Sequence, residues 1–397
     1  MRLAQRATRI KPSATLTINA KAKALKQKGV HIISFGVGEP DFDTPLHIQD
    51  AAMQAIRDGH TRYTAVSGID ELKDAIVDVM QKDYGLTYRR ENVLVSCGGK
   101  HALYNLFQSL LDPGDEVIIP APYWVSYPDM VELTGATAVT VPTLEADDFK
   151  LRPEQLESVL TPKTRMLILN SPSNPTGAHY RRDELEALAE LVLKHDLIVL
   201  SDDIYYRILF DGCEWINMAM LSERLKERTF IANGVSKTYC MTGWRIGYLV
   251  GNAGVLAAAS KIQSQSTSNP CSIAQWASVA ALNGPQDTVR EMVQVFQERC
   301  RYVLTRLAEI PGVTCHRPAG AFYVFPNFSC TFGKRANGHV IKGSLDLADY
   351  LMEQANVAVV PGSAFGEDSC LRFSYALSME ELTEGFNRLV QAVASLR

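Results

Sequence analysis

Long apolar runs, paired cysteines and an excess of basic residues are all missing from this 397-residue sequence. No apolar stretch approaches the roughly 20 residues that a membrane-spanning helix needs. The eight cysteines are scattered without the spacing of a zinc site, which is typical of free thiols in a reducing cytoplasm. The basic start, residues 1–12, lacks the apolar core of a secretory signal. We therefore expect a cytoplasmic protein without a membrane segment or a metal site.

The charge balance also narrows the choice of partners. A net charge of −4 argues against a general affinity for nucleic acid or for anionic membranes. No internal repeat or low-complexity tract is present. With 46% apolar residues, the chain can bury a large core, and its length suits two domains.

Short apolar runs rich in Val, Ile and Leu recur through the middle of the chain. They span residues 93–95, 117–119, 138–141, 166–169, 198–200, 229–232 and 246–250. Most are separated by segments with helical spacing, such as 102–111, 183–194 and 253–264. Wholly apolar strands that alternate with helices predict a mainly parallel sheet covered on both faces. Ligands of such sheets bind beyond the carboxyl ends of the strands.

The C-terminal part predicts a second, smaller α/β domain. A long helix is expected over 288–308, followed by strands at 322–325, 357–360 and 371–374 and helices at 345–354 and 379–393. We predict an N-terminal arm that completes this small domain (1–46), a large domain (47–285) and the small C-terminal domain (286–397).

The segment 233–248 carries the strongest chemical signal. Lys237 follows the apolar run 229–232, next to Ser236, and Arg245 comes eight residues later. A loop lysine usually extends its ammonium group to water. Here Ser236 and Arg245 are both oxyanion ligands, and a neutral lysine amine forms Schiff bases with carbonyl substrates and with pyridoxal phosphate. We hypothesise that Lys237 binds this cofactor, with Ser236 and Arg245 on its phosphate.

Two further motifs follow predicted strands. Gly98 and Gly99 precede a helix, where backbone amides can approach an anion closely, although a plain turn explains the pair equally well. Trp124 follows a proline turn and is either an ordinary core aromatic or a platform that stacks on a planar ring.

Three polar residues at strand ends or within strands have both structural and functional interpretations. Asn174 lies in the proline-rich loop 170–177 and either serves the turn or donates to a ligand oxygen. Asp202 either caps the following helix or is a buried carboxylate that needs a cation such as a pyridinium nitrogen. Arg372, inside the apolar run 371–374, forms either a structural ion pair or a bidentate clamp on a substrate carboxylate.

Taken together, these motifs resemble the fold type I aminotransferases of the aspartate aminotransferase family, which depend on pyridoxal 5'-phosphate. The bacterial branch in which a lysine follows the paired glycines is most similar. The resemblance runs from about residue 11 to the C-terminus, through the loop 36–45, Gly98-Gly99-Lys100, Pro122-Tyr123-Trp124, 170–177, 201–205, Ser236-Lys237, 241–248 and 371–376. It implies a mixed, mainly parallel seven-stranded sheet in the large domain.

The resemblance also implies roles for matching positions. The catalytic residues would be Lys237, which holds the cofactor and moves protons, Asp202 on the ring nitrogen, and Tyr205. Asn174 and Tyr205 would hydrogen-bond the phenolic oxygen, while Trp124 stacks on the ring. The phosphate would be bound by Gly98, Gly99, Ser236 and Arg245 near Lys100, and by Tyr63 of the neighbouring subunit. The substrate would be bound by Arg372 at its α-carboxylate, by Gly38, Asn174 and Trp124, and by Lys100 at a distal carboxylate.

The activity implied is transfer of the amino group from L-aspartate to 2-oxoglutarate in a homodimer with shared active sites. The alternatives are an aminotransferase for aromatic amino acids or prephenate, a carbon–sulfur lyase or aminocyclopropane-carboxylate synthase, and the cofactor-binding sensory domain of a transcription regulator. Such regulators carry an additional DNA-binding module, whereas few residues precede the loop 36–45 here. Two positions depart from the family pattern: Asp203 replaces the usual Glu, and Gly234 replaces a hydroxyl residue expected to contact the phosphate.

Overall fold

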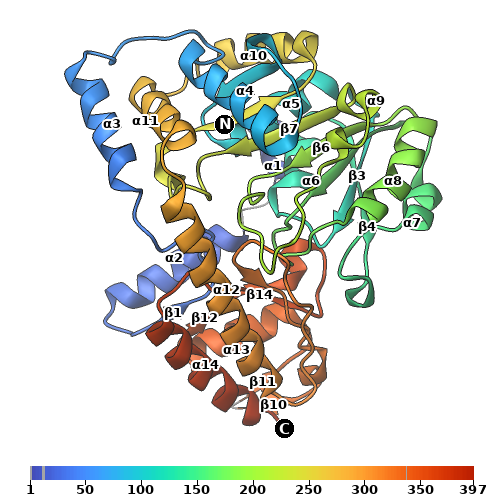
Figure 1. Cartoon of the computed structure of the whole chain (residues 1–397). Helices are drawn as coiled ribbons and strands as arrows, with labels where there is room; N and C mark the ends of the chain where they lie inside the picture. Colours follow the sequence, from blue (N-terminus) through green and yellow to red (C-terminus); the bar gives the residue numbers. More distant parts are fainter. Residues whose placement is uncertain (1, 11–13, 337) are drawn as a thin grey trace.

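The computed structural model describes residues 2–10, 14–336 and 338–397. A seven-stranded sheet forms the centre of the upper part of the molecule in Figure 1. Its strands are β2 (Val93–Ser96), β3 (Glu116–Ala121), β4 (Thr137–Pro142), β5 (Thr164–Asn170), β6 (Ile198–Asp202), β7 (Thr229–Gly234) and β8 (Gly247–Val250). In space the order is β2-β8-β7-β6-β5-β3-β4, and β8 runs antiparallel to both of its neighbours. The predicted mainly parallel sheet and each of its apolar runs are confirmed.

Helices cover both faces of this sheet because its strands are apolar on both sides. Along β5, Met166 and Ile168 pack into one core with α5 (Gly99–Leu110), α6 (Ser126–Glu132) and α10 (Ala253–Ser266). The alternate residues, Leu167 and Leu169, pack into another with α7 (Pro153–Val159), α8 (Arg182–Lys194) and α9 (Glu223–Lys226). Near β2 and β8 this second face is covered by α3 (Leu46–Arg57), α4 (Asp70–Tyr84) and α11 (Ser272–Asn283). Because successive side chains of a strand point to opposite faces of the sheet, each central strand packs against the helix layers on both faces.

The lower part in Figure 1 has its own core and is reached through α12 (Asp287–Ala308). This helix runs from the sheet-bearing part into the lower part, and its 22 residues span roughly 33 Å at 1.5 Å per residue. The other helices of the lower part are α2 (Ala14–Gln27), α13 (Ser344–Gln354) and α14 (Met379–Ala394).

Short strands complete the lower part. β9 (Tyr323–Val324), β14 (Leu371–Ser374) and β13 (Val360–Pro361) form a three-stranded antiparallel sheet. β1 (Ile33–Ser34) pairs in parallel with β12 (Val357–Ala358), and β10 (Arg335–Ala336) pairs with β11 (His339–Val340). The predicted single strand at 357–360 is wrong in one respect, because β12 and β13 belong to different sheets. The parallel pairing of β1 with β12 brings this part of the N-terminal segment against the lower part.

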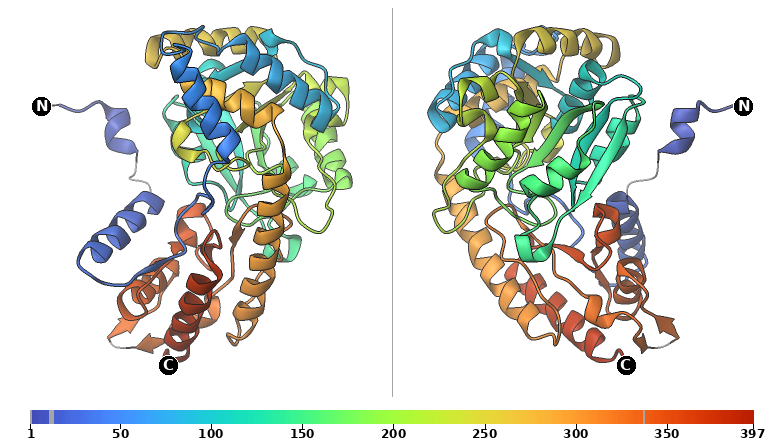
Figure 2. Two further views of the ribbon diagram at one scale, coloured as in Figure 1. Left: turned by 60° about the vertical axis from the view of Figure 1, so that its left-hand side comes forward. Right: turned by 90° about the vertical axis from the view of Figure 1, so that its right-hand side faces the viewer.

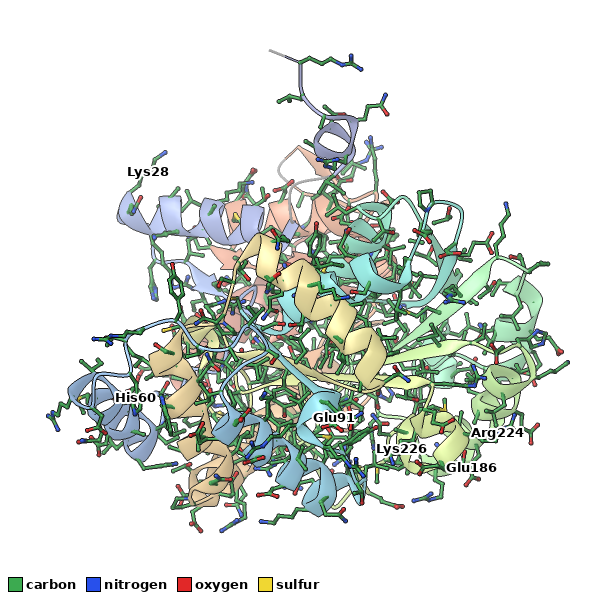
Figure 3. The ribbon with its side chains drawn as sticks, turned by 90° about the horizontal axis from the view of Figure 1, so that it is seen from above. Lys28, His60, Glu91, Glu186, Arg224 and Lys226 are labelled. Atoms are coloured by element: carbon green, nitrogen blue, oxygen red, sulfur yellow. The ribbon has the colours of Figure 1, made fainter. Side chains whose placement is uncertain are left out.

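The N-terminal stretch also differs from a simple loop. Residues 5–9 form the short helix α1 (Gln5–Arg9), which projects away from the rest of the molecule in Figure 2. From above, Figure 3 shows the charged side chain of Lys28 at the periphery. No helix in the described part of the chain is long and apolar enough to cross a membrane.

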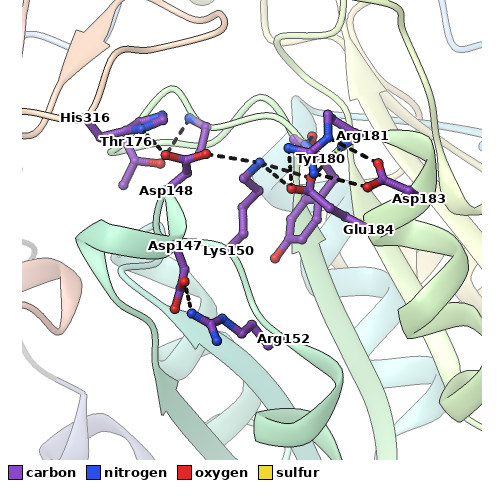
Figure 4. Close-up of polar contacts among 12 residues, drawn as sticks. Asp147, Asp148, Lys150, Arg152, Thr176, Tyr180, Arg181, Asp183, Glu184 and His316 are labelled. Atoms are coloured by element: carbon purple, nitrogen blue, oxygen red, sulfur yellow. Dashed lines mark hydrogen bonds and ion pairs between the residues drawn. The ribbon is translucent and has the colours of Figure 1, made fainter.

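A polar network joins residues 147–184 of the upper part to His316 of the lower part (Figure 4). His316 Nδ1 lies 2.8 Å from Asp148 Oδ1, and Lys150 Nζ lies 3.4 Å from Asp148 and 2.8 Å from Glu184. Just beyond His316, the backbone amide of Ala319 donates to the carbonyl of Gly177 at 2.9 Å. The chain of the lower part is therefore held against the end of the loop 170–177.

Candidate active site

A cavity of about 400 Å³ opens where β5, β6 and β7 end. Most residues expected at the site line it: Gly38, Gly99, Lys100, Trp124, Asn174, Asp202, Tyr205, Ser236, Lys237, Arg245 and Arg372. The lining also contains Thr15, Leu103, Val125, Ser126, Tyr127, Asn170, Ile204, Ala232, Asn233, Thr242 and Tyr323. Segments far apart in the sequence thus meet at the sheet edge where ligands of parallel sheets bind.

Lys237 lies on the turn after β7 and opens into this cavity. Its amine donates to the backbone carbonyl of Gly38, and it lies 5.9 Å from the ring centroid of Phe322. Burial lowers the pKa of Lys237 to about 8, against the opposing effect of the Glu39 carboxylate, and the cations Arg372 and Arg245 add to the lowering. A neutral amine is therefore much easier to obtain here than on an exposed lysine.

Asp202 ends β6 and is buried at the cavity wall. Its Oδ2 accepts a hydrogen bond from the Tyr127 hydroxyl at 2.6 Å, and its Oδ1 accepts from the Ile204 amide at 3.3 Å. Burial raises the pKa of Asp202 to about 6, while the hydrogen bond from Tyr127 opposes the rise. The carboxylate thus faces the cavity with little to compensate its charge, apart from the more distant Lys237.

The neighbouring Asp203 points away from the cavity into the core. The Ser201 hydroxyl donates to its Oδ1 at 2.7 Å, and the Asn217 amide donates to its Oδ2 at 2.7 Å. Burial raises its pKa well above the usual range. The first departure from the family pattern therefore lies behind the cavity wall.

Arg372 is 2% exposed, and its partners are neutral oxygen atoms. Nη1 donates to Asn174 Oδ1 at 3.0 Å and Nη2 to the Gly36 carbonyl at 2.9 Å, whereas Nε is buried without a partner in the described structure. The guanidinium lies 4.6 Å from the ring centroid of Tyr323. The alternative of a structural ion pair is not what these contacts show. Burial lowers the pKa of Arg372, as expected for a cation whose charge awaits a partner.

Gly99, Ser236 and Arg245 line a corner of the cavity at the start of α5, whereas Gly98, the residue before this helix, lies against the Arg245 guanidinium and is not itself a lining residue. Gly98 has a φ of +89°, and a Cβ there would collide with the Arg245 guanidinium. The Arg245 side chain is anchored by donation from Nη1 to the Thr242 carbonyl at 2.8 Å. Backbone amides at a helix start, a hydroxyl and a guanidinium together form a site for a phosphate-like anion.

The second departure from the family pattern, Gly234, has a steric reason. A Cβ at this position would lie 2.9 Å from the carbonyl oxygen of Ile246 and 3.0 Å from Cα of Gly247. A hydroxyl residue would therefore require β7 and β8 to move apart.

Lys100 and Trp124 form the outer wall. Lys100 Nζ lies 5.0 Å from the ring centroid of Trp124, and partial burial of its ammonium group, with Arg245 nearby, lowers its pKa. Tyr205 is buried deeper and shares a 2.9 Å hydrogen bond with the Tyr323 hydroxyl. Tyr63 is 91% exposed and does not belong to the lining residues.

Sequence reasoning missed Tyr127 and Tyr323. Tyr127 lies three residues after Trp124 in the first turn of α6, and this helical spacing was an available signal. Tyr323 lies in an apolar strand, where nothing in the sequence separates a cavity residue from a core residue. The described residues contain no group of three or more His, Cys, Asp or Glu side chains placed to hold a metal ion.

Comparisons with known proteins identify the family of this chain. A model of the family described as aminotransferase class I and II matches residues 30–389. A protein named aspartate aminotransferase from Bacillus subtilis (strain 168) is 47% identical over 393 residues, covering 99% of both chains. One named aspartate/prephenate aminotransferase from Nitrosomonas europaea is 47% identical over 397 residues, covering 99% of this chain and 100% of that protein.

Solved structures are similarly close. The crystal structure of the aspartate aminotransferase from Rhizobium meliloti has a TM-score of 0.97 at 45% identity and covers 100% of both chains. The aspartate aminotransferase from Thermus thermophilus with maleate has a TM-score of 0.92 at 42% identity, covering 99% of this chain and 100% of that one. The chain therefore belongs to the class I and II aminotransferases, the transaminases of fold type I that depend on pyridoxal 5'-phosphate.

Proposed function

We propose that this enzyme transfers the amino group of L-aspartate to 2-oxoglutarate, giving oxaloacetate and L-glutamate. The observation that carries the proposal is a pair of cations that line one cavity: Arg372, whose hydrogen-bond partners among the described residues are neutral, and Lys100 on the outer wall. Two cations suit a substrate with a carboxylate at each end. The names of the Bacillus subtilis relative and of the Thermus thermophilus structure with maleate, a dicarboxylate, support the same substrate class.

The cavity fits pyridoxal phosphate in three respects. It contains an amine whose pKa is lowered by burial, a buried carboxylate without an ionic partner, and an anion corner whose Arg245 guanidinium a Cβ at Gly98 would displace. We assign the phosphate to the Gly98 and Gly99 amides, Ser236 and Arg245, the ring face to Trp124, and the phenolic oxygen to Asn174 and Tyr205. When bound, the cofactor supplies a conjugated ring that accepts the electron pair left by removal of the substrate α-proton.

Lys237 moves the proton in this proposal. Its amine is neutral above about pH 8 and lies beside the Gly38 carbonyl, so it can accept the proton from the substrate α-carbon and return it to the neighbouring carbon. Asp202 holds a proton on the ring nitrogen through a charge-assisted contact. The Tyr127 hydroxyl, at 2.6 Å, keeps Asp202 oriented and favours its charged form.

Arg372 and Lys100 orient the substrate. Hydrogen bonds to Asn174 and to the Gly36 carbonyl fix the orientation of the Arg372 guanidinium. Its remaining donors are therefore held in one direction, ready for the carboxylate of a substrate. When both carboxylates of the substrate are bound, the covalent bond between its α-carbon and the α-hydrogen is held perpendicular to the ring of the cofactor. Holding a reactant in attack geometry can contribute about 7–11 kcal/mol.

The proposal includes a cytoplasmic homodimer built from the domains 1–46, 47–285 and 286–397. Tyr63 is exposed beside a helix, α3, that also exposes Leu46, Met53 and Ile56. These features suit a second copy of the chain whose Tyr63 reaches the phosphate. All eight cysteines are free, as is usual in a reducing compartment.

Prephenate is a second candidate substrate, favoured by the name of the Nitrosomonas europaea relative. It also carries a carboxylate remote from its oxo acid, which Lys100 could meet at the outer wall.

A direct assay separates the candidates. Cofactor-loaded enzyme is given L-aspartate with either 2-oxoglutarate or prephenate, and the oxaloacetate formed is measured by coupled reduction. We expect turnover with 2-oxoglutarate. Lys237→Ala should abolish this turnover, and Lys100→Ala should raise the KM for the dicarboxylate substrates. Absence of oxaloacetate with both acceptors would contradict the proposed substrate.

A further inference from the structure

The loop 36–45 has no helix or strand of its own, yet it supplies two carbonyl groups to the active site. The Gly36 carbonyl accepts from Arg372 Nη2 at 2.9 Å, and the Gly38 carbonyl accepts from the Lys237 amine. The position of this loop therefore affects both the group that grips the substrate and the group that moves the proton.

A buried arginine holds the loop from the other side. Arg299, on α12, donates from Nη1 to Asp41 Oδ1 at 2.7 Å and from Nη2 to Asp41 Oδ2 at 2.9 Å. The Arg299 side chain is 9% exposed and the Asp41 side chain 26%. The guanidinium lies 5.3 Å from the ring centroid of Phe42 and 5.8 Å from that of Phe296. Two parallel hydrogen bonds between a fork and a carboxylate fix orientation as well as distance.

Two other hydrogen bonds connect the loop 36–45 to residues 240–242. The Thr44 hydroxyl donates to the Cys240 carbonyl at 2.7 Å, and the Thr242 hydroxyl donates to Glu39 at 2.7 Å. Both partners belong to the turn that follows Lys237. The Asp41–Arg299 pair thus connects the loop to α12, while the threonines connect it to the catalytic turn.

We propose that Arg299 is a positioning residue for substrate binding, which acts by fixing the loop 36–45 so that the Gly36 carbonyl keeps the Arg372 fork aimed at the substrate carboxylate. The inference rests on the proposed function, because it requires a carboxylate at Arg372. Arg299 is not among the residues that line the cavity. The part of its effect that acts through the Arg372 fork belongs to binding common to the ground and transition states, and this part raises KM rather than lowering kcat.

The test uses cofactor-loaded enzyme and succinate, a dicarboxylate without an amino group, whose binding is followed by cofactor absorbance. The variants are Arg299→Met, Arg299→Lys, Asp41→Asn and the double variant Arg299→Met/Asp41→Asn. The matched control is Arg301→Met, which removes an exposed ion pair with Asp211 from the same helix.

We expect Arg299→Met to weaken succinate binding about tenfold and to raise KM for aspartate equally, since small displacements of binding groups have effects of this order. The succinate affinity of Arg299→Lys should lie between those of the wild type and of Arg299→Met, because lysine keeps the positive charge but cannot form two parallel hydrogen bonds to Asp41. Asp41→Asn should match Arg299→Met, and the double variant should be no worse than either. Arg301→Met should bind succinate as the wild type does.

Melting temperatures distinguish positioning from stability. If Arg299→Met and Asp41→Asn melt at lower temperature but bind succinate with unchanged affinity, the inference is wrong. Additive effects in the double variant would also overturn it, because one pair cannot be broken twice. If Arg299→Met does not fold, the isosteric Asp41→Asn decides the same question. Failure of the wild type itself to bind succinate would refute the proposed function instead.

Discussion

Lys237 is a residue on which burial and neighbouring charges act in opposite directions. Burial and the cations Arg372 and Arg245 favour the neutral amine, whereas Glu39 and Asp202 favour the ammonium form. The net result is a pKa of about 8, compared with about 10.4 for a lysine in water. The shift is downward, so Lys237 loses its proton at a lower pH in the folded chain than in the unfolded chain.

The first prediction follows from this pKa. In the cofactor-free protein, acetylation of Lys237 should rise with pH through a midpoint near 8, because the neutral amine is the reactive form. Mass spectrometry of the peptide that contains Lys237 measures the modified fraction at each pH. A midpoint near that of free lysine would show that burial does not govern this amine.

Tyr127 provides the second residue-scale prediction. Tyr127→Phe removes the 2.6 Å hydrogen bond to Asp202, so the pKa of Asp202 should rise further above its present value of about 6. A hydrogen bond to a charged group contributes about 1.5–3 kcal/mol, and we expect kcat at neutral pH to fall about tenfold. The loss should be smaller at higher pH, where Asp202 regains its charge, as a kcat profile against pH would reveal.

Tyr88→Phe is the matched control for that experiment. The Tyr88 hydroxyl is buried without a hydrogen-bond partner in the described structure, so its removal should leave the profile unchanged. Equal effects of the two substitutions would show that the Tyr127 hydroxyl has no specific effect on Asp202.

At the scale of elements, the positions of the strands were predictable, whereas their directions and their division between sheets were not. The central strands β5, β6 and β7 are short runs that are mostly apolar on both faces, and this pattern is visible without any knowledge of partners. The pattern cannot show that β8 runs antiparallel, because direction depends on the connections rather than on composition. The division between β12 and β13 was missed because one apolar run, 357–360, serves two sheets.

The same distinction applies to the active site. Lys237, Asp202 and Arg372 were predictable because a charged residue at the end of an apolar strand or within one needs a partner. The place of Tyr323 at the cavity was not predictable, because it depends on the tertiary packing that brings its hydroxyl within hydrogen-bond distance of the Tyr205 hydroxyl. Which hydroxyl faces a cavity is decided by tertiary packing.

The contact between β8 and α5 gives the element-scale prediction. A Cβ at Gly247 would collide with the backbone of Gly98 and Gly99, so Gly247→Ala must push the start of α5 away from the sheet. Overpacking of this kind costs about 1–3 kcal/mol. We expect a lower melting temperature and weaker binding of pyridoxal phosphate, measured by absorbance titration.

Gly243→Ala tests whether this effect is specific. Gly243 lies on the same segment, but a Cβ there would meet nothing within 4 Å. It should therefore bind the cofactor as the wild type does. Unaltered cofactor binding in Gly247→Ala would mean that the anion corner tolerates displacement of α5.

At the scale of the whole molecule, the exposed Tyr63 and the cavity suggest that one chain does not complete its own site. If two copies exchange Tyr63, then Tyr63→Ala damages the site of the opposite subunit, whereas Lys237→Ala damages the site of its own. Each homodimer of either variant is then defective at both sites, although for different reasons.

Mixing the two variants after reversible dissociation should therefore restore activity. In a mixed dimer, one site keeps both Lys237 and Tyr63, and random pairing predicts recovery of about a quarter of wild-type activity for a twofold-symmetric dimer. The control is a mixture of Lys237→Ala with Asp202→Ala, whose positions line the cavity of the same chain, so every site in that mixture lacks one of them. Recovery in the first mixture alone would establish shared sites. Recovery in neither, with dissociation and pairing verified by labelled subunits, would mean that each chain carries a site independent of the Tyr63 of its neighbour.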